Sequence, residues 1–190
     1  MKNFELTNET IVNDCGVTLH RIKAVKDIIT PRFTVKAGEL GGFVEKVDNL
    51  ADDAWVFGNA WVYGNARVYD NAWVCGNARV YGNAEVYGNA RVYDNACVYG
   101  NALVSDNARI YDDAEVFRTN HYLVVGPIGS RNGYTTFFRS KEGAIKVKCG
   151  CFGGTTDEFL DKVEKTHGDS KYAKVYRIAT EMALAQIDMN

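Results

Sequence analysis

The chain has 190 residues, and its 22 Lys and Arg against 24 Asp and Glu give a formal net charge of −2. This charge argues against a protein that coats nucleic acid without sequence preference, because such proteins are basic. No run of about 18 apolar residues is long enough to span a membrane, and the start, MKNFELTNET, lacks the apolar core of a signal peptide. Five cysteines without such a signal predict reduced thiols in a cytoplasmic protein.

The first 37 residues are predicted to cap one end of the molecule. Two stretches with alternating apolar residues, Phe4–Val12 and Val17–Val25, flank the turn sequence Asp14-Cys15-Gly16, which is the pattern of a β-hairpin. A hairpin is needed there because the repeats that follow predict parallel strands, and an open end of a parallel stack leaves strand edges unpaired. We therefore assign residues 1–37 to an N-terminal β cap.

From Val56 to Val116 the sequence repeats every six residues, through 11 units. Each unit has an aliphatic residue and an alanine two positions before it, and a Gly-Asn or Asp-Asn pair separates all units but the last two, between which the pair is Asp112-Asp113. Side chains two apart lie on one side of a strand, and a turn pair at each step bends the chain at regular corners. Three strands and three corners make a coil of about 18 residues, so the units predict nearly four stacked coils.

The spacing Val56-x-x-x-Ala60 fits the motif aliphatic-x-x-x-small-x. The array thus resembles the hexapeptide-repeat, left-handed parallel β-helix family. The left hand is an implication of this resemblance, because spacing alone does not determine it. The segment Gly38–Glu45 looks like a starter coil, so we place the β-helix at residues 38–118 and predict a mainly β fold.

Residues 119–190 predict a small α+β module. The three expected strands are His121–Gly126, Tyr134–Arg139 and Ala144–Cys149. A helix is expected at Thr155–Thr166, because Thr155 or Thr156 can serve as its N-cap and two acidic residues follow in its first turn. A second helix is expected at Ser170–Ile187 from its apolar periodicity.

The whole chain also resembles a type of uncharacterised phage and prophage protein. The resemblance rests on five segments besides the starter and the array: Thr18–Ile22, Gly126–Arg131, Thr135–Phe138, Gly150–Phe152 and Thr166–Gly168. It implies the host cytoplasm as the location, and it carries no activity with it.

A candidate anion site lies in the tail, where residues 121–150 hold five basic residues and one acidic residue. The loop Gly126–Arg131 can turn backbone N–H groups toward a phosphate, hydroxyls and cations can bind it, and an aromatic ring can stack on a base. The helix start near Thr155 offers a second anion pocket. The alternative interpretation, without a ligand, is a hairpin with solvated lysines. The candidate ligand-binding residues are Ser130, Arg131, Tyr134, Thr135, Thr136, Phe138, Arg139 and Lys148.

The leading hypothesis is therefore a non-enzymatic binding protein that sequesters a small anionic ligand. Given the phage-like resemblance, the ligand to test is a nucleotide immune signal of the host, such as a cyclic dinucleotide or a cyclic ADP-ribose. No Walker or dinucleotide fingerprint is present, and we expect no cofactor.

Two further chemistries have weaker support. Many hexapeptide-repeat proteins are acyltransferases with a histidine base, but the array contains no histidine, and only His121 follows it closely. Cys149-Gly-Cys151 offers half of a zinc site, which needs about four ligands, so two small apolar side chains are the preferred interpretation and no metal is expected.

The aromatic residues that point outward from the coils support a structural or protein-interaction scaffold as the alternative function. With three strands in each coil, every third unit shares a face, and a face of stacked aromatic rings exposes unusual apolar area. We expect a homo-oligomer, and the family resemblance implies a trimer. The expected interface residues are Trp55, Phe57, Trp73, Tyr93 and Tyr111.

Overall fold

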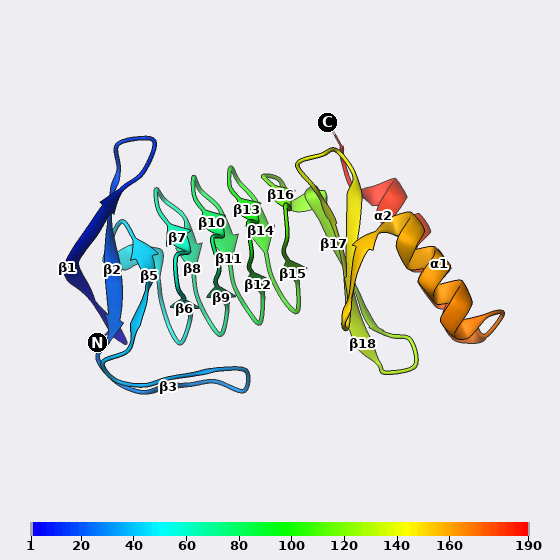
Figure 1. The fold of residues 1–190 in the computed structure, drawn as a ribbon, viewed down its shortest axis with the longest axis horizontal. Coiled ribbons are helices and arrows are strands. Elements are labelled where there is room, and N and C mark those ends of the chain that lie inside the picture. The colour runs from blue at the N-terminus through cyan, green and yellow to red at the C-terminus, as the bar shows by residue number, and fades with distance from the viewer. Residues whose placement is uncertain (1, 190) are drawn as a thin grey trace.

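The computed structural model describes residues 2–189, so residues 1 and 190, the outer ends of the predicted cap and module, lie outside it. The molecule is mainly β and elongated: a strand-rich cap, a parallel β-solenoid of about four turns and a module with two helices follow one another along its long axis (Figure 1). This confirms the predicted fold class. None of the described helices is long and apolar enough to cross a bilayer.

The cap begins with the predicted hairpin, in which β1 (Phe4–Val12) pairs antiparallel with β2 (Thr18–Ala24). Strand β2 continues antiparallel onto β5 (Leu40–Val44), and β5 pairs in parallel with the first coil. The two glycines in β5 are required by close approach, because a Cβ at Gly41 would lie 2.5 Å from the Val56 carbonyl oxygen. The cap therefore pairs the strand edge that an open coil would expose.

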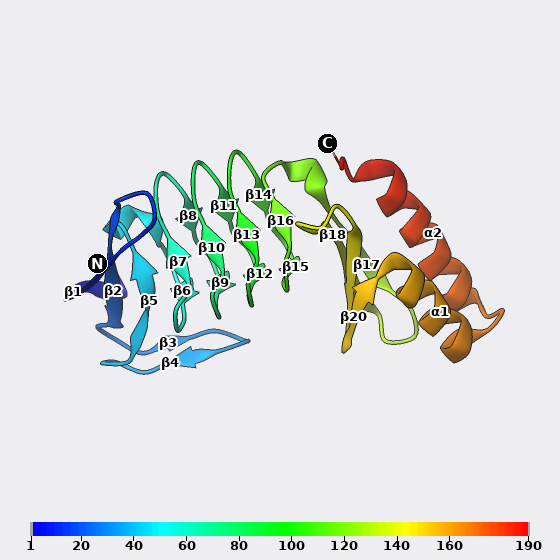
Figure 2. The same ribbon diagram turned by 45° about the horizontal axis from the view of Figure 1, so that its top comes forward.

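Sequence reasoning missed a second hairpin, β3 (Ile28–Ile29) and β4 (Thr34–Val35), here called the arm. The arm extends from the cap along the side of the solenoid (Figures 1 and 2). The Phe33 ring meets the Phe57 ring edge-on at 5.4 Å, and Arg32 Nη2 donates to Asn107 Oδ1 at 2.9 Å. The paired segments are only two residues long, so no alternating pattern marks them in the sequence.

The solenoid consists of eleven two-residue strands in three parallel sheets, and partners are 18 residues apart, as Arg79 pairs with Trp61 and Cys97. The repeated alanines and aliphatic residues fill the interior, where most are fully buried, and each buried valine contributes about 1.5–3 kcal/mol. The strands are β6 (Trp55–Val56), β7 (Trp61–Val62), β8 (Arg67–Val68), β9 (Trp73–Val74), β10 (Arg79–Val80), β11 (Glu85–Val86), β12 (Arg91–Val92), β13 (Cys97–Val98), β14 (Leu103–Val104), β15 (Arg109–Ile110) and β16 (Glu115–Val116).

The backbone conformation at the corners explains why each turn pair begins with Gly or Asp. The Gly or Asp that precedes each asparagine has a positive φ, such as +59° at Asp70, a conformation that Gly, Asn and Asp adopt most readily. The asparagines stack into ladders: Asn65 Nδ2 donates to Asn83 Oδ1 at 3.2 Å, and Asn83 Nδ2 donates to Asn101 Oδ1 at 3.1 Å. Each coil is thereby held to the next outside the core.

The C-terminal module has four antiparallel strands instead of the three expected: β17 (Tyr122–Ile128), β18 (Gly133–Arg139), β19 (Ile145–Cys149) and β20 (Phe152–Thr155). Helices α1 (Thr156–His167) and α2 (Lys171–Gln186) cover the side of this sheet that faces away from the solenoid (Figure 2). The sequence prediction missed β20 because two of its four residues are glycine, which weakens the strand pattern.

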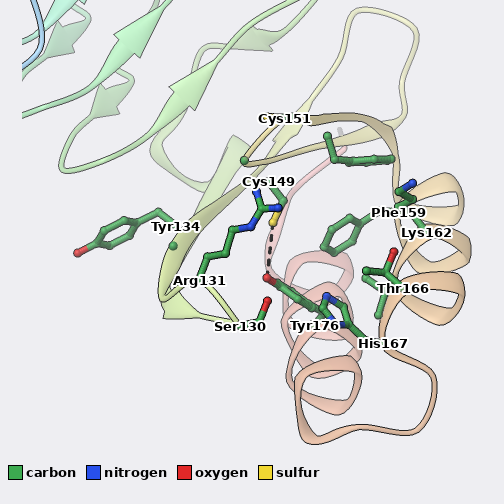
Figure 3. A pocket seen from close by; sticks show the side chains of 14 residues that line it. Ser130, Arg131, Tyr134, Cys149, Cys151, Phe159, Lys162, Thr166, His167 and Tyr176 are labelled. Carbon is green, nitrogen blue, oxygen red and sulfur yellow. Dashed lines mark hydrogen bonds between the residues drawn. The ribbon is translucent and has the colours of Figure 1, made fainter.

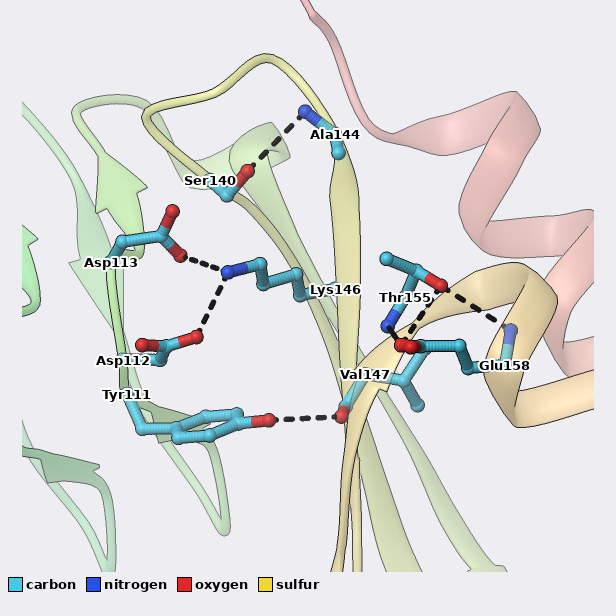
Figure 4. Close-up of polar contacts among 9 residues, drawn as sticks. All are labelled: Tyr111, Asp112, Asp113, Ser140, Ala144, Lys146, Val147, Thr155 and Glu158. Atoms are coloured by element: carbon cyan, nitrogen blue, oxygen red, sulfur yellow. Dashed lines mark hydrogen bonds and ion pairs between the residues drawn. The ribbon is translucent and has the colours of Figure 1, made fainter. Parts of the chain in front are cut away.

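The module packs on the last coil of the solenoid. Lys146 Nζ lies 2.8 Å from Asp112 Oδ2 and 2.7 Å from Asp113 Oδ1, both on the last coil, and the Tyr111 hydroxyl donates to the Val147 carbonyl at 3.4 Å (Figure 4). Burial opposes the Lys146 charge, but the hydrogen bonds to the two carboxylates outweigh it and hold the pKa of Lys146 above its ordinary value.

Candidate functional site

A cavity of about 290 Å³ lies in the module between the β17–β18 loop, the β19–β20 turn and the two helices. Figure 3 shows Arg131 on the loop side and Lys162 and His167 on α1 across the cavity. The apolar part of the wall includes Phe152 and Phe159, and the Tyr176 ring comes from α2. The volume is near the lower end of the range for small-molecule sites.

The charge of the cavity has one sign. Arg131, Lys162 and His167 line it, and none of its lining residues is Asp or Glu. The His167 ring is 5.8 Å from the Tyr176 ring, so the histidine lies against an aromatic wall. Two permanent cations without a facing carboxylate favour an anionic ligand.

Tyr176 supplies a protonated phenol to the cavity. Burial, and after it the neighbouring Cys149 thiol, raises the pKa of Tyr176 to about 12, so its hydroxyl keeps its proton at neutral pH. The hydroxyl lies 3.9 Å from Cys149 Sγ. The loop fits closely over this ring, because a Cβ at Gly129 would lie 1.8 Å from the hydroxyl oxygen, and the φ of Gly129 is +73°.

The structure brings only three of the eight predicted ligand residues, Ser130, Arg131 and Tyr134, to this cavity. Ser130 and Arg131 lie in the β17–β18 loop, as the glycine-rich sequence indicated. Tyr134 is the second residue of β18 and lies at the rim, and its ring points away from the helices (Figure 3).

The other predicted residues do not reach the cavity wall. Thr135 is buried and donates to Cys149 Sγ at 3.2 Å, and Thr136 Oγ1 accepts from the Arg109 backbone N–H at 3.1 Å. Phe138 is fully buried in the core that the module shares with the solenoid. Thr136 and Phe138 hold the sheet on the last coil, whereas Thr135 bonds the neighbouring strand of the same sheet. Sequence alternation alone did not distinguish either face from a ligand face.

Two of the predicted ligand-binding cations instead contact side chains of the solenoid. Arg139 Nη1 lies 2.5 Å from Glu115 Oε2, and Lys148 Nζ lies 4.8 Å from the centre of the Tyr111 ring. The expected anion pocket at the start of α1 is filled by the chain itself. Thr155 and Glu158 form a capping box, and the Thr155 backbone N–H, donating to the Glu158 carboxylate, holds the pKa of Glu158 below its ordinary value.

Sequence reasoning missed the helical side of the cavity, which supplies Phe159, Lys162, Val163, Thr166, His167 and Tyr176. A usable signal was present in α1, because Phe159, Lys162, Thr166 and their neighbours recur at helical spacing and so share one face. What the sequence did not reveal was that this face lies opposite the loop of Arg131.

The histidine considered for acyl transfer is enclosed. His121 is fully buried, its Nδ1 accepts from the Phe117 backbone N–H at 3.4 Å, and its ring meets the Phe117 ring edge-on at 4.1 Å. Burial, followed by the charges of Arg139 and Arg118, lowers the pKa of His121. A base for an incoming hydroxyl or amine needs an exposed nitrogen, which His121 does not offer.

The two cysteines of Cys149-Gly-Cys151 lie in different environments. Cys149 contacts Thr135 and Tyr176, whereas Cys151 is exposed at the turn. Within residues 2–189, no group of three or more His, Cys, Asp or Glu side chains is placed to hold a metal ion.

The aromatic face predicted as an oligomer interface is partly occupied within the chain. Trp55 is only 1 % exposed, and Phe57 packs between the arm residue Phe33 and Trp73. Trp55 was expected on an exposed outer face of the coils, and its burial shows that it is covered within the chain. Further along it, Trp73, Tyr93 and Tyr111 are stacked in sequence and half-buried.

Comparison with known families addresses the repeats. Three stretches, residues 60–76, 72–86 and 84–100, match the family model of the YdcK beta solenoid repeat. This chain contains a β-solenoid repeat. The matched stretches lie within the array, and they do not include the cavity. No curated protein matches the chain significantly.

Proposed function

We propose that the C-terminal module binds a small anionic ligand with a planar ring, of the nucleotide class. The observation that carries the proposal is the cavity itself, where Arg131, Lys162 and His167 lie beside aromatic rings and no carboxylate shares the wall. Guanidinium and ammonium groups bind phosphates through charge-assisted hydrogen bonds, and aromatic rings stack on a base.

The size of the cavity restricts the ligand. About 290 Å³ suits one nucleotide unit, so a cyclic dinucleotide or a cyclic ADP-ribose would place one unit inside and leave the other at the rim near Tyr134. Capture of this kind needs no catalytic group. A host immune signal sequestered by a phage-type protein remains the finer form of the proposal, and its support is the resemblance of the sequence.

Binding is tested first by thermal shift with cyclic dinucleotides, cyclic ADP-ribose, NAD and acyl-CoA. A ligand at 100 times its dissociation constant adds about 2.7 kcal/mol, which a melting curve resolves. Recovery of the ligand unchanged after the protein is denatured distinguishes sequestration from turnover.

The variant pair Arg131→Ala and Lys162→Ala then locates the site. The matched control, Lys141→Ala with Lys165→Ala, removes two exposed cations that do not line the cavity and lowers the net charge equally. We expect the first pair to weaken binding at least 100-fold and the control to leave it within threefold. Equal weakening by both pairs, or no binding of any anion in the panel by the parent, would overturn the proposal.

A further inference from the structure

Three arginines lie together where the arm meets the solenoid. The arm runs along the sheet that contains β9, β12 and β15 (Figure 2). Arg91 of β12 and Arg109 of β15 are register partners on neighbouring coils, about 4.8 Å apart along the stack, and so point to the same outer face. From the arm, Arg32 donates to the side chain of Asn107, two residues before Arg109. We call Arg32, Arg91 and Arg109 the arginine cluster.

The arginine cluster has no acidic partner. None of its three guanidinium groups forms an ion pair with Asp or Glu within residues 2–189. Burial, and after it the charges of Arg32 and Arg109, lowers the pKa of Arg91. Like charges that face each other across adjacent strands are destabilising. The cluster therefore costs stability unless a negative charge joins it.

The repeat itself does not require this arrangement. Residues Asn65–Asp70 and Asn89–Asp94 are identical in sequence. Arg67 of the first copy is in register with Glu85 on the next coil, whereas Arg91 of the second is in register with another arginine. The array thus accepts an acidic residue at the position opposite an arginine, and at the cluster a second cation occupies that position instead.

Next to the cluster lies a buried donor without an acceptor. Trp73 is the register partner of Arg91 on the preceding coil, and the Arg91 guanidinium carbon is 5.3 Å from the centre of its ring. The Trp73 indole N–H is buried and has no hydrogen-bond partner within residues 2–189. Buried donors are normally paired. Donors are therefore in excess on the coils on both sides of Arg91, which favours a ligand with several acceptor oxygens.

We propose that the arginine cluster binds a phosphate group. Phosphate carries the negative charge that the cluster lacks, and guanidinium groups bind it through charge-assisted, often bidentate hydrogen bonds. Arg91 and Arg109 are fixed on consecutive coils and Arg32 comes from the arm, so the bound group would bridge the arm to the solenoid. None of the three arginines lines the cavity, so this inference does not depend on the ligand proposed for the module.

The first test is isothermal titration calorimetry with inorganic phosphate and, separately, with adenosine monophosphate. Both titrations use the full chain with Arg131→Ala and Lys162→Ala, so that the cavity does not contribute. We expect saturable binding with a dissociation constant below about 1 mM. Tighter binding of the nucleotide would assign the cluster to a phosphate monoester, and equal or weaker binding would assign it to free phosphate.

Single substitutions then locate the site. Arg91→Gln and Arg109→Gln should each raise the dissociation constant about 10-fold or more, because each removes hydrogen bonds to a charged group. The matched control is Arg67→Gln, which changes the same position of the identical six-residue sequence in another sheet. It should leave the constant within threefold.

Arg109→Glu gives a second test that does not rely on loss of a side chain, because it places beside Arg91 the acidic neighbour that Arg67 has in Glu85. It should keep or raise the melting temperature in phosphate-free buffer, since attraction replaces repulsion, and it should abolish phosphate binding. Three results would overturn the proposal: no saturable binding up to about 10 mM phosphate, ten times a dissociation constant of about 1 mM; equal weakening by Arg67→Gln and Arg91→Gln; or binding that survives Arg109→Glu.

Discussion

The loop over the candidate cavity offers a sharp test of the packing. Gly129 and Gly143 both have a φ of +73°, yet a Cβ at Gly129 would lie 1.8 Å from the Tyr176 hydroxyl, whereas a Cβ at Gly143 meets nothing within 4 Å. Gly143→Ala therefore measures the cost of the left-handed backbone alone, about 1–2 kcal/mol. Gly129→Ala carries the same cost and an overpacking cost of about 1–3 kcal/mol more.

Urea unfolding of both variants, followed by circular dichroism, measures the difference between them. Tyr176→Phe removes the nearest atom of the clash and leaves the ring carbon at 2.4 Å, so it should rescue Gly129→Ala in part and leave Gly143→Ala unchanged. Distant sites add within about 0.5 kcal/mol, which sets the threshold for coupling. If the two alanine variants lose the same free energy of unfolding, the loop does not rest on Tyr176 and the cavity geometry is refuted.

Three further outcomes follow from the structure. Burial lowers the pKa of His121 below its ordinary 6.5, so as the pH falls the unfolded chain binds this proton before the folded chain does. The free energy of unfolding should therefore decrease as the pH drops below about 6.5. A pH series of urea titrations measures this decrease, which should be smaller in His121→Asn. Lys146→Met should cost about 1–3 kcal/mol by leaving two carboxylates unpaired, and equal stability at 0.1 M and 1 M salt in the parent would contradict that role. Ile110→Ala, in the fully buried interior, should cost about 2–5 kcal/mol, whereas Ile110→Val should cost about 0.5–1.5 kcal/mol, both read from melting curves.

The repeat array was predictable because its determinants are local. A six-residue period places Ala and Val on one side of each short strand, and the positive φ at residues such as Asp70 needs the Gly or Asp that the sequence supplies. Stacking then follows from repetition, since each coil contacts only its neighbours. The N-cap of α1 at Thr155 was equally local, and the structure has it where the sequence indicated.

The cavity was only partly predictable because its walls are distant in the sequence. The glycine-rich loop marked Arg131, but alternation along β18 could not tell which face meets the last coil, so Thr136 and Arg139 were assigned to a ligand when they hold the solenoid. The arm over Phe57 likewise depends on contacts between segments more than twenty residues apart. By itself the sequence determined the coils, their register and the helices, because each arises from neighbouring residues or exact repetition. Only the tertiary structure decided where Lys162 and Tyr176 face Arg131, because that requires the packing of helices on a sheet whose two faces look alike in sequence.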